Sequence, residues 1–204
     1  METRLKKHIK TLIICSAIYL IGFFVLERFH LFELTYMETW LDNYIPFNEY
    51  FVIPYVIWYF YIILGFIYFL FQDDFQYHRC MYYLFAGMFI ALFIYTFFPN
   101  GQNLRVELTN DNIFQSMVSF LYTIDTPTNV CPSLHTYNSI MMYVALKRSH
   151  FFKNRRVLDI LTFILVVSIC ASTVLIKQHA IVDVFGGILM SIIVYYVGKY
   201  KFGY

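Results

Sequence analysis

Charged residues are scarce in this chain, and their scarcity is the first constraint on what the protein can be. Only 14% of the 204 residues are Asp, Glu, Lys or Arg, and the formal net charge is +2. A soluble domain typically has about 25% charged residues, and a nucleic-acid-binding surface needs a concentrated basic patch. The composition therefore excludes nucleic acid as a partner and argues against a soluble fold.

Cysteine pairs and metal-ligand clusters are also missing. The four cysteines, Cys15, Cys80, Cys131 and Cys170, include no CxxC spacing, and three of them lie inside apolar segments. We interpret them as small buried apolar residues, not as a disulfide framework or a zinc site. Because no group of His, Cys and carboxylate residues has metal-ligand spacing, we expect no metal and no other cofactor. The absence of repeats and low-complexity tracts predicts one domain over residues 1–204.

Long apolar segments make up most of the remaining sequence, which is 60% hydrophobic. Crossing the hydrocarbon core of a membrane takes roughly 17–25 apolar residues in a helix. The segments that reach or approach this length are 9–26, 50–71, 80–98, 134–146, 157–176 and 180–197. We therefore predict an all-α polytopic membrane protein with a bundle of six transmembrane helices. His135 and Asn138 in the fourth segment and Asp183 in the sixth indicate function, since polar residues inside a membrane are costly.

The distribution of basic residues supports six spans. With six spans, the two termini and the loops at 72–79 and 147–156 lie on one side of the membrane. Of the fifteen Lys and Arg residues, the other side then has only Arg28, Arg105 and Lys177. Basic residues gather on the cytoplasmic side of membrane proteins. We therefore predict a multi-pass protein of the cell membrane with both termini in the cytoplasm.

Two outer segments link these spans. Residues 27–49 alternate apolar side chains with Glu33, Glu38 and Asp42, which predicts a short amphipathic helix lying along the membrane surface. Residues 99–131 form the longest loop, and long ordered loops are usually functional.

Three polar stretches lie at the outer ends of successive spans. PNGQNLRVEL follows the third span, NVCPSLHTYNS opens the fourth, and STVLIKQHAIVD leads into the sixth. Their candidate site residues are Arg105, Ser133, Leu134, His135, Lys177, His179 and Asp183.

The first half of this set is suited to binding a phosphate. Pro132 fits the first turn of a helix, which leaves the amides of Ser133 and Leu134 free to bind an anion. Arg105 and Lys177 would add positive charge, so these residues together form a candidate phosphate cradle.

The second half is suited to phosphoryl transfer. His179 and Asp183 are four residues apart and share one face of a helix. A carboxylate behind an imidazole fixes its tautomer and leaves the other ring nitrogen free to attack, and His135 would protonate the leaving oxygen. A single histidine at a membrane boundary is more often just an interfacial residue, so the prediction depends on these motifs occurring together and in order.

At these residues the chain resembles the type 2 phosphatidic acid phosphatase superfamily, with its motifs KxxxxxxRP, PSGH and SRxxxxxHxxxD. PSLH matches the second motif with Leu134 in place of glycine, and Ser172, His179 and Asp183 match the spacing of the third. The resemblance implies that His179 is a nucleophile that forms a phosphohistidine, that Asp183 orients it, and that His135 is the general acid. It also implies a lipid phosphate as substrate and a site on the non-cytoplasmic face.

The chain departs from the family pattern at its basic positions. In the first motif Phe98 and Val106 stand where lysine and proline are expected, and in the third Thr173 replaces arginine. Lys177 would replace one of the lost charges. PSLH with KQHxxxD resembles the inositol phosphorylceramide synthase-like branch, so a head-group phosphotransferase is an alternative to a lipid phosphate phosphatase. The substitution at Thr173 leaves a third alternative, a non-catalytic lipid-binding or transport protein.

Overall fold

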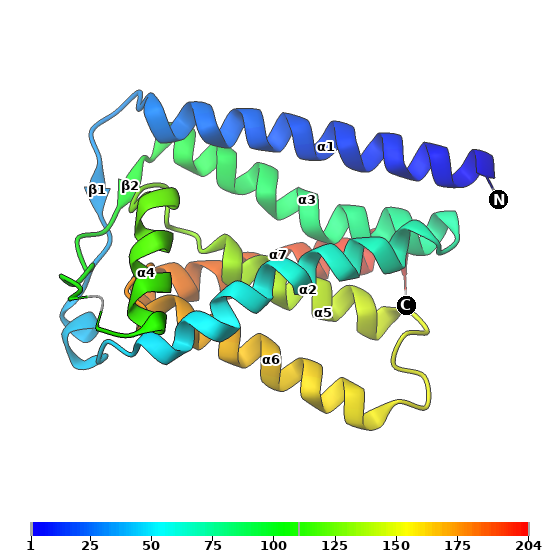
Figure 1. Cartoon of the computed structure of the whole chain (residues 1–204). Helices are drawn as coiled ribbons and strands as arrows, with labels where there is room; N and C mark the ends of the chain where they lie inside the picture. Colours follow the sequence, from blue (N-terminus) through cyan, green and yellow to red (C-terminus); the bar gives the residue numbers. More distant parts are fainter. Residues whose placement is uncertain (1, 110, 204) are drawn as a thin grey trace.

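The protein is almost entirely helical in a computed structural model that describes residues 2–109 and 111–203 (Figure 1). Within these residues the α-helices are α1 (Glu2–Arg28), α2 (Val52–Leu70), α3 (Asp74–Phe97), α4 (Ile113–Ile124), α5 (Leu134–Arg148), α6 (Arg156–Leu175) and α7 (Ile181–Phe202). The short elements are the strands β1 (Thr35–Tyr36) and β2 (Asn100–Gly101) and the 3₁₀ helices η1 (Trp40–Tyr44) and η2 (Glu49–Phe51). The predicted all-α fold class is confirmed.

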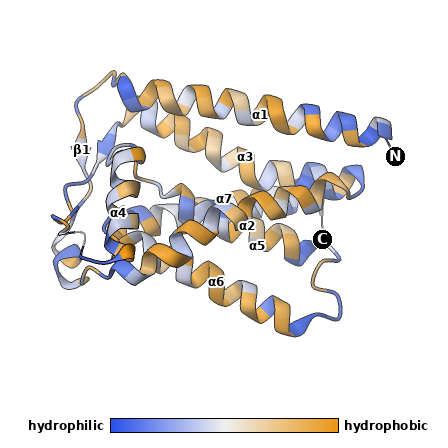
Figure 2. Cartoon of the chain, viewed as in Figure 1, coloured by the Kyte–Doolittle hydropathy of each residue, from blue (hydrophilic) through white to orange (hydrophobic). Residues whose placement is uncertain are grey.

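Five of the described helices, α1, α2, α3, α6 and α7, are long and apolar enough to cross a membrane. Hydrophobic residues run along their lengths and hydrophilic residues gather toward their ends (Figure 2). Large apolar side chains such as Ile21, Phe60 and Phe93 lie exposed on the outside of the bundle. These exposed apolar surfaces fit a membrane protein, because lipid is the solvent that such surfaces prefer.

The fourth predicted span, which corresponds to α5, differs from the other five because it lies inside the bundle. It packs against α2, α3, α6 and α7, and its polar side chains Thr136, Asn138 and Ser139 are buried. With 15 residues it extends about 22 Å, less than the thickness of the hydrocarbon core. Protein surrounds it in place of lipid, so neither its short length nor its polar residues are costly.

Close contact between α3 and α5 holds this central helix in place. Gly87 lies against the ring of Tyr137, where a Cβ atom would come within 2.0 Å of the ring. The Gly87 amide also donates a hydrogen bond of 3.0 Å to the Tyr137 hydroxyl. A glycine lets the two backbones approach, and this contact helps to position the start of α5.

The two termini lie at one end of the bundle, together with the α2–α3 turn and the loop at 149–155 (Figure 1). The strands, the 3₁₀ helices and α4 lie at the opposite end (Figure 1). The candidate site residues belong to the segments at this second end, which we call the outer end.

The predicted amphipathic helix in residues 27–49 is wrong. After α1 ends at Arg28, the chain forms β1, which pairs in parallel with β2 so that Thr35 lies opposite Asn100. Asp42 in η1 accepts hydrogen bonds from the amides of Thr39 at 2.7 Å and Ile181 at 2.8 Å. The pairing of β1 with β2 and the hydrogen bond from Ile181 are contacts with distant parts of the chain, and they outweigh the local helical pattern.

An amphipathic helix does occur at the outer end, inside the predicted loop at 99–131. Asn112 begins α4 by accepting hydrogen bonds from the amides of Phe114 and Gln115, a typical N-cap. The buried face of α4 presents Val118 and Leu121 to the cluster around α2.

Candidate active site

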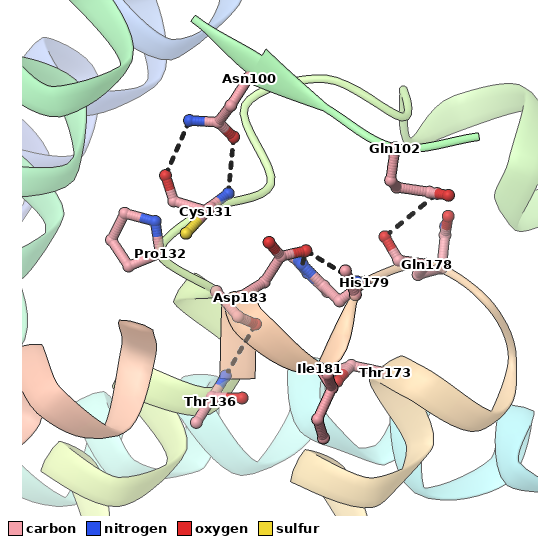
Figure 3. Close-up of polar contacts among 12 residues, drawn as sticks. Asn100, Gln102, Cys131, Pro132, Thr136, Thr173, Gln178, His179, Ile181 and Asp183 are labelled. Carbon is pink, nitrogen blue, oxygen red and sulfur yellow. Dashed lines mark hydrogen bonds and ion pairs between the residues drawn. The ribbon is translucent and has the colours of Figure 1, made fainter. Parts of the chain in front are cut away.

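The turn between α6 and α7 brings a histidine and a carboxylate together. The amides of Gln178 and His179 both donate to the carbonyl of Thr173 at 3.0 Å, which folds the chain back over the end of α6. Asp183, fully buried in the first turn of α7, places Oδ2 3.2 Å from His179 Nδ1 (Figure 3). The same oxygen accepts a hydrogen bond of 2.8 Å from the amide of Ala180. Because Asp183 accepts at Nδ1, the His179 Nε2 atom is left available for chemistry.

The start of α5 is docked on this turn. The Ser133 amide donates to the carbonyl of Asp183 at 2.9 Å. Gly187 lies so near that a Cβ atom there would be 2.6 Å from the Ser133 carbonyl oxygen. This docking brings the rings of His135 and His179 to 5.6 Å between centroids, in an edge-to-face arrangement. The structure therefore brings together the three residues predicted to be catalytic.

Aromatic side chains from α2 enclose the His135 ring, and sequence reasoning missed them. Tyr55 stacks on it at 4.5 Å and Trp58 lies at 4.2 Å between centroids. The His135 Nε2 atom is buried without a hydrogen-bond partner among the described residues. Tyr55 and Trp58 read as ordinary residues of an apolar span, so only the packing of α2 on α5 shows that they belong to the site.

A pocket of about 290 Å³ joins the two histidines to the outer surface of the bundle. Leu134, His135 and His179 line this pocket together with Leu20 and Phe24 of α1. Leu20 is 46% exposed and Phe24 is 55% exposed. These exposed apolar side chains connect the pocket with the apolar outer surface of the bundle.

Comparison with known proteins identifies the fold family of this site. Residues 106–204 match the family model of the PAP2 superfamily. Residues 106–204 belong to the PAP2 superfamily. The matched region spans α4 to α7 and includes both histidines and Asp183, and it supports a phosphatase-type enzyme.

A curated relative extends the comparison to an archaeal protein. An uncharacterized protein of Methanocaldococcus jannaschii is 32% identical over 113 residues, which are 55% of this chain. The aligned region covers 41% of that relative, so the chain spans about two fifths of its length. No solved structure matches the chain.

Arg105, which matches the arginine of the first PAP2 motif, lies beside the site but does not line the pocket. Its guanidinium donates to the carbonyls of Tyr122 at 2.7 Å and Asp125, and to Gln178 Oε1 at 2.7 Å. Burial lowers the pKa of Arg105, while the charge of Asp125 opposes this effect. Since Gln178 precedes His179, Arg105 contacts the turn that carries His179 and not the pocket itself.

Lys177 is not brought to the histidines. Its ammonium donates to the carbonyls of Asp42 at 3.0 Å and Ile45 at 2.5 Å, and it does not line the pocket. Burial lowers the pKa of Lys177, and the charge of Asp42 partly opposes this. The predicted placement of Lys177 in a phosphate cradle with the histidines is therefore not seen, because the left-handed turn at Lys177, with φ of 58°, sends its side chain toward η1.

Ser133 and Leu134, both predicted to bind phosphate at the start of α5, have different positions in the structure. The Ser133 hydroxyl accepts from the Thr136 amide at 3.4 Å as the helix N-cap, and Ser133 is fully buried away from the pocket. Leu134 does line the pocket. Of the four predicted phosphate-binding residues, only Leu134 lies at the pocket in the described structure.

The segment that follows α3 forms hydrogen bonds with two loops, the one before α5 and the one between α6 and α7. The sequence did not predict this role. Asn100 Oδ1 accepts from the Cys131 amide at 2.7 Å, and its Nδ2 donates to the Cys131 carbonyl at 2.8 Å (Figure 3). Gln102 Nε2 donates to the carbonyls of Lys177 and Gln178 at 3.1 and 3.4 Å. The stretch PNGQ contains turn-forming residues, but nothing local in it indicates which distant loops it holds.

We expect Lys177→Ala to destabilise the protein more than it weakens phosphate binding. The substitution leaves the carbonyls of Asp42 and Ile45 without a charged donor, and such a hydrogen bond contributes about 1.5–3 kcal/mol. The measurement is the thermal unfolding midpoint, with the exposed Lys153→Ala as the matched control. An unchanged midpoint together with weaker vanadate binding would show that Lys177 contacts phosphate after all.

Proposed function

We propose that this PAP2 protein is a metal-independent lipid phosphate phosphatase of the cell membrane that acts through a phosphohistidine intermediate. The observation that carries the proposal is the placement of His179, supported by Asp183, opposite His135 in one pocket that connects with the apolar outer surface of the bundle. The resemblance of motifs noted above agrees with these roles.

The proposed reaction has two steps. His179 Nε2 attacks phosphorus, so a P–N bond forms as the bond to the lipid oxygen breaks, and His135 gives its proton to that leaving oxygen. The buried Asp183 carboxylate stabilises the positive charge that develops on His179. Water, deprotonated by His135, then attacks phosphorus and releases inorganic phosphate and free His179.

The shape of the pocket supports a lipid as the substrate. Leu20 and Phe24 of α1 and Tyr59 of α2 line the opening and are themselves exposed to the surroundings of the bundle. A lipid could place its phosphate between the histidines while its acyl chains remain in the membrane. Apart from Arg28, Arg105 and Lys177, the basic residues belong to the terminal segments and to the connections at 72–79 and 147–156, which lie at the end that carries the termini. This distribution supports cytoplasmic termini and a site on the non-cytoplasmic face.

A head-group phosphotransferase is the second candidate, and the composition of the pocket favours it. Among the described residues that line the pocket, none is Lys or Arg. A phosphate monoester carries close to two negative charges, whereas a phosphodiester carries one and demands less positive charge from the protein. In this version a lipid or sugar hydroxyl replaces water in the second step.

Incubation of the purified protein with a panel of lipid phosphates and phospholipids tests both candidates. We expect free phosphate from a monoester, in the presence of a metal chelator, if the protein is a phosphatase. A new phospholipid without free phosphate would support the transferase. If neither product forms and the wild type behaves like His179→Ala, the proposed function is wrong and the protein binds lipid without catalysis.

A further inference from the structure

The pocket contains two carboxylates that the proposed reaction does not use. Glu27, at the end of α1, and Asp125, just after α4, both line it together with the histidines. Glu27 accepts a hydrogen bond of 2.7 Å from the Thr126 hydroxyl, and Asp125 accepts one of 2.6 Å from the Tyr55 hydroxyl. Neither carboxylate forms a salt bridge within the described part of the chain.

The negative charges of Glu27 and Asp125 would repel a phosphate bound in the same pocket. The nearest basic groups, Arg28 beside Glu27 and Arg105 beside Asp125, attract the carboxylates but do not line the pocket. A phosphate placed between the histidines therefore meets two negative groups and no cationic side chain in the lining. Like charges at short range in a poorly solvated pocket repel strongly, so some positive charge must enter with the ligand.

The distance between the two parts of the site fits a small head group. Tyr55 presents its ring face to His135 at 4.5 Å and its hydroxyl to Asp125 at 2.6 Å. Asp125 Oδ2 also lies 3.4 Å from the Nε2 atom of Gln178, the neighbour of His179. The Asp125 carboxylate is thus separated from the histidines by about one tyrosine side chain, a span that a phosphate and an ammonium on adjacent carbons can bridge.

Unpaired polar atoms in the same pocket indicate that it takes a polar ligand. Asn129 is 95% buried, since its exposed fraction is 5%, and both atoms of its amide lack a partner among the described residues. Asn138 likewise has an unpartnered Oδ1 atom. Both residues line the pocket. Buried polar groups are normally hydrogen-bonded, so these amides are available to a head group.

The remaining lining favours an organic cation over a metal ion. Tyr19, Trp58 and Tyr59 line the pocket beside the two carboxylates, and aromatic faces attract ammonium groups. Calcium prefers six to eight oxygen ligands and magnesium near-ideal octahedral geometry. No group of three or more His, Cys, Asp or Glu side chains suited to a metal occurs within the residues that the structure describes.

We propose that the pocket selects a zwitterionic lipid phosphate, with the phosphate between His135 and His179 and an ammonium group at Glu27 and Asp125. The substrate brings the positive charge that the pocket lining does not supply. The inference rests on the proposed function for the position of the phosphate, but it concerns binding and can be tested without turnover.

The test compares pairs of ligands of which only one member carries an ammonium group. One pair is a long-chain 2-aminoalkyl phosphate and its N-acetyl derivative, and a second pair is phosphatidylethanolamine and phosphatidylglycerol. The first pair places the cation on the lipid backbone and the second places it on the head group, so the two pairs distinguish the sources. Trp40 and Trp58 are the only tryptophans, so in a Trp40→Phe background the fluorescence of Trp58 reports binding inside the pocket.

We expect the ammonium ligand of at least one pair to bind about tenfold more tightly than its partner in the absence of divalent cations. Glu27→Gln and Asp125→Asn should each reduce this preference to about threefold or less, while binding of the N-acetyl derivative stays the same or improves. Glu33→Gln, which removes an exposed carboxylate at the same end of the protein, is the matched control and should keep the preference. Unchanged binding of the N-acetyl derivative also shows that the variants are folded.

Three results would overturn the inference. They are equal binding within both pairs, a preference that survives in both carboxylate variants, and a preference that appears only with added calcium or magnesium, which would mean that the carboxylates hold a metal ion. Failure of the proposed function looks different, because the ammonium preference would then persist in binding while no phosphate is released or transferred.

Discussion

His179→Ala is expected to abolish turnover of every phosphorylated substrate, whatever its leaving group. The substitution removes the atom that attacks phosphorus, and removing a nucleophile supported by a carboxylate costs up to about 10⁶-fold in rate. Because the His179 ring lies against Asp183 at 3.2 Å, the variant also leaves a fully buried carboxylate without its ring partner. His179→Gln, which keeps a hydrogen-bond donor near Asp183, should fold normally and still be inactive.

The measurement combines steady-state rates with trapping of the intermediate. After brief mixing with a ³²P-labelled lipid phosphate, the wild type should carry label that is stable to alkali and lost in acid, as expected for a phosphohistidine. The label should be missing in His179→Ala and present in His150→Ala, the control for an exposed histidine elsewhere in the chain. Labelling of the His179→Ala protein would rule out this residue as the nucleophile.

His135→Ala is expected to lose about 10²–10⁴-fold in rate on a lipid phosphate, the usual contribution of a general acid, and far less on nitrophenyl phosphate. A lipid alkoxide needs a proton to leave, whereas nitrophenolate leaves well without one. The His135 ring lies 5.6 Å from His179 between centroids, close enough to reach an oxygen on a phosphate that His179 attacks.

His135 also contributes to packing, so a control must separate the two effects. The ring is enclosed by Tyr55 and Trp58, and alanine would leave space there. His135→Gln fills more of that space but cannot act as an acid near neutral pH, so it should show the same dependence on the leaving group. Equal proportional losses on both substrates would mean that His135 binds phosphate or supports the pocket and donates no proton.

The local features of this protein could be predicted from its sequence. Apolar segments of sufficient length indicated the helices, because burying the backbone in lipid requires its hydrogen bonds to be satisfied within each segment. The pairing of His179 with Asp183 was predicted from their four-residue spacing, but the predicted common helix face is wrong, because His179 lies in the turn before α7 and only Asp183 lies in the helix. A helix near Pro132 was also predicted, but Pro132 lies before the Ser133 N-cap and not in the first turn of α5, and the Ser133 amide donates to the Asp183 carbonyl.

Features that depend on distant contacts could not be predicted in this way. The segment at 27–49 was expected to be helical but instead pairs with β2 and binds the start of α7 through Asp42. The direction of a long side chain also depends on contacts with residues that are distant in the sequence. Lys177 was expected at the phosphate, yet the carbonyls of Asp42 and Ile45 receive its ammonium.

The sequence by itself predicted a helical membrane protein and the pairing of His179 with Asp183, because both depend on residues close together in the chain. The tertiary structure decided what surrounds those histidines. Packing of α1 on α3, and of α2 on both α4 and α5, brings Glu27, Trp58 and Asp125 into one pocket, although these residues are far apart in the sequence. In the sequence, each of them resembles an ordinary residue of a helix end or an apolar span. Its position in the pocket depends on contacts between helices and not on its neighbours in the chain.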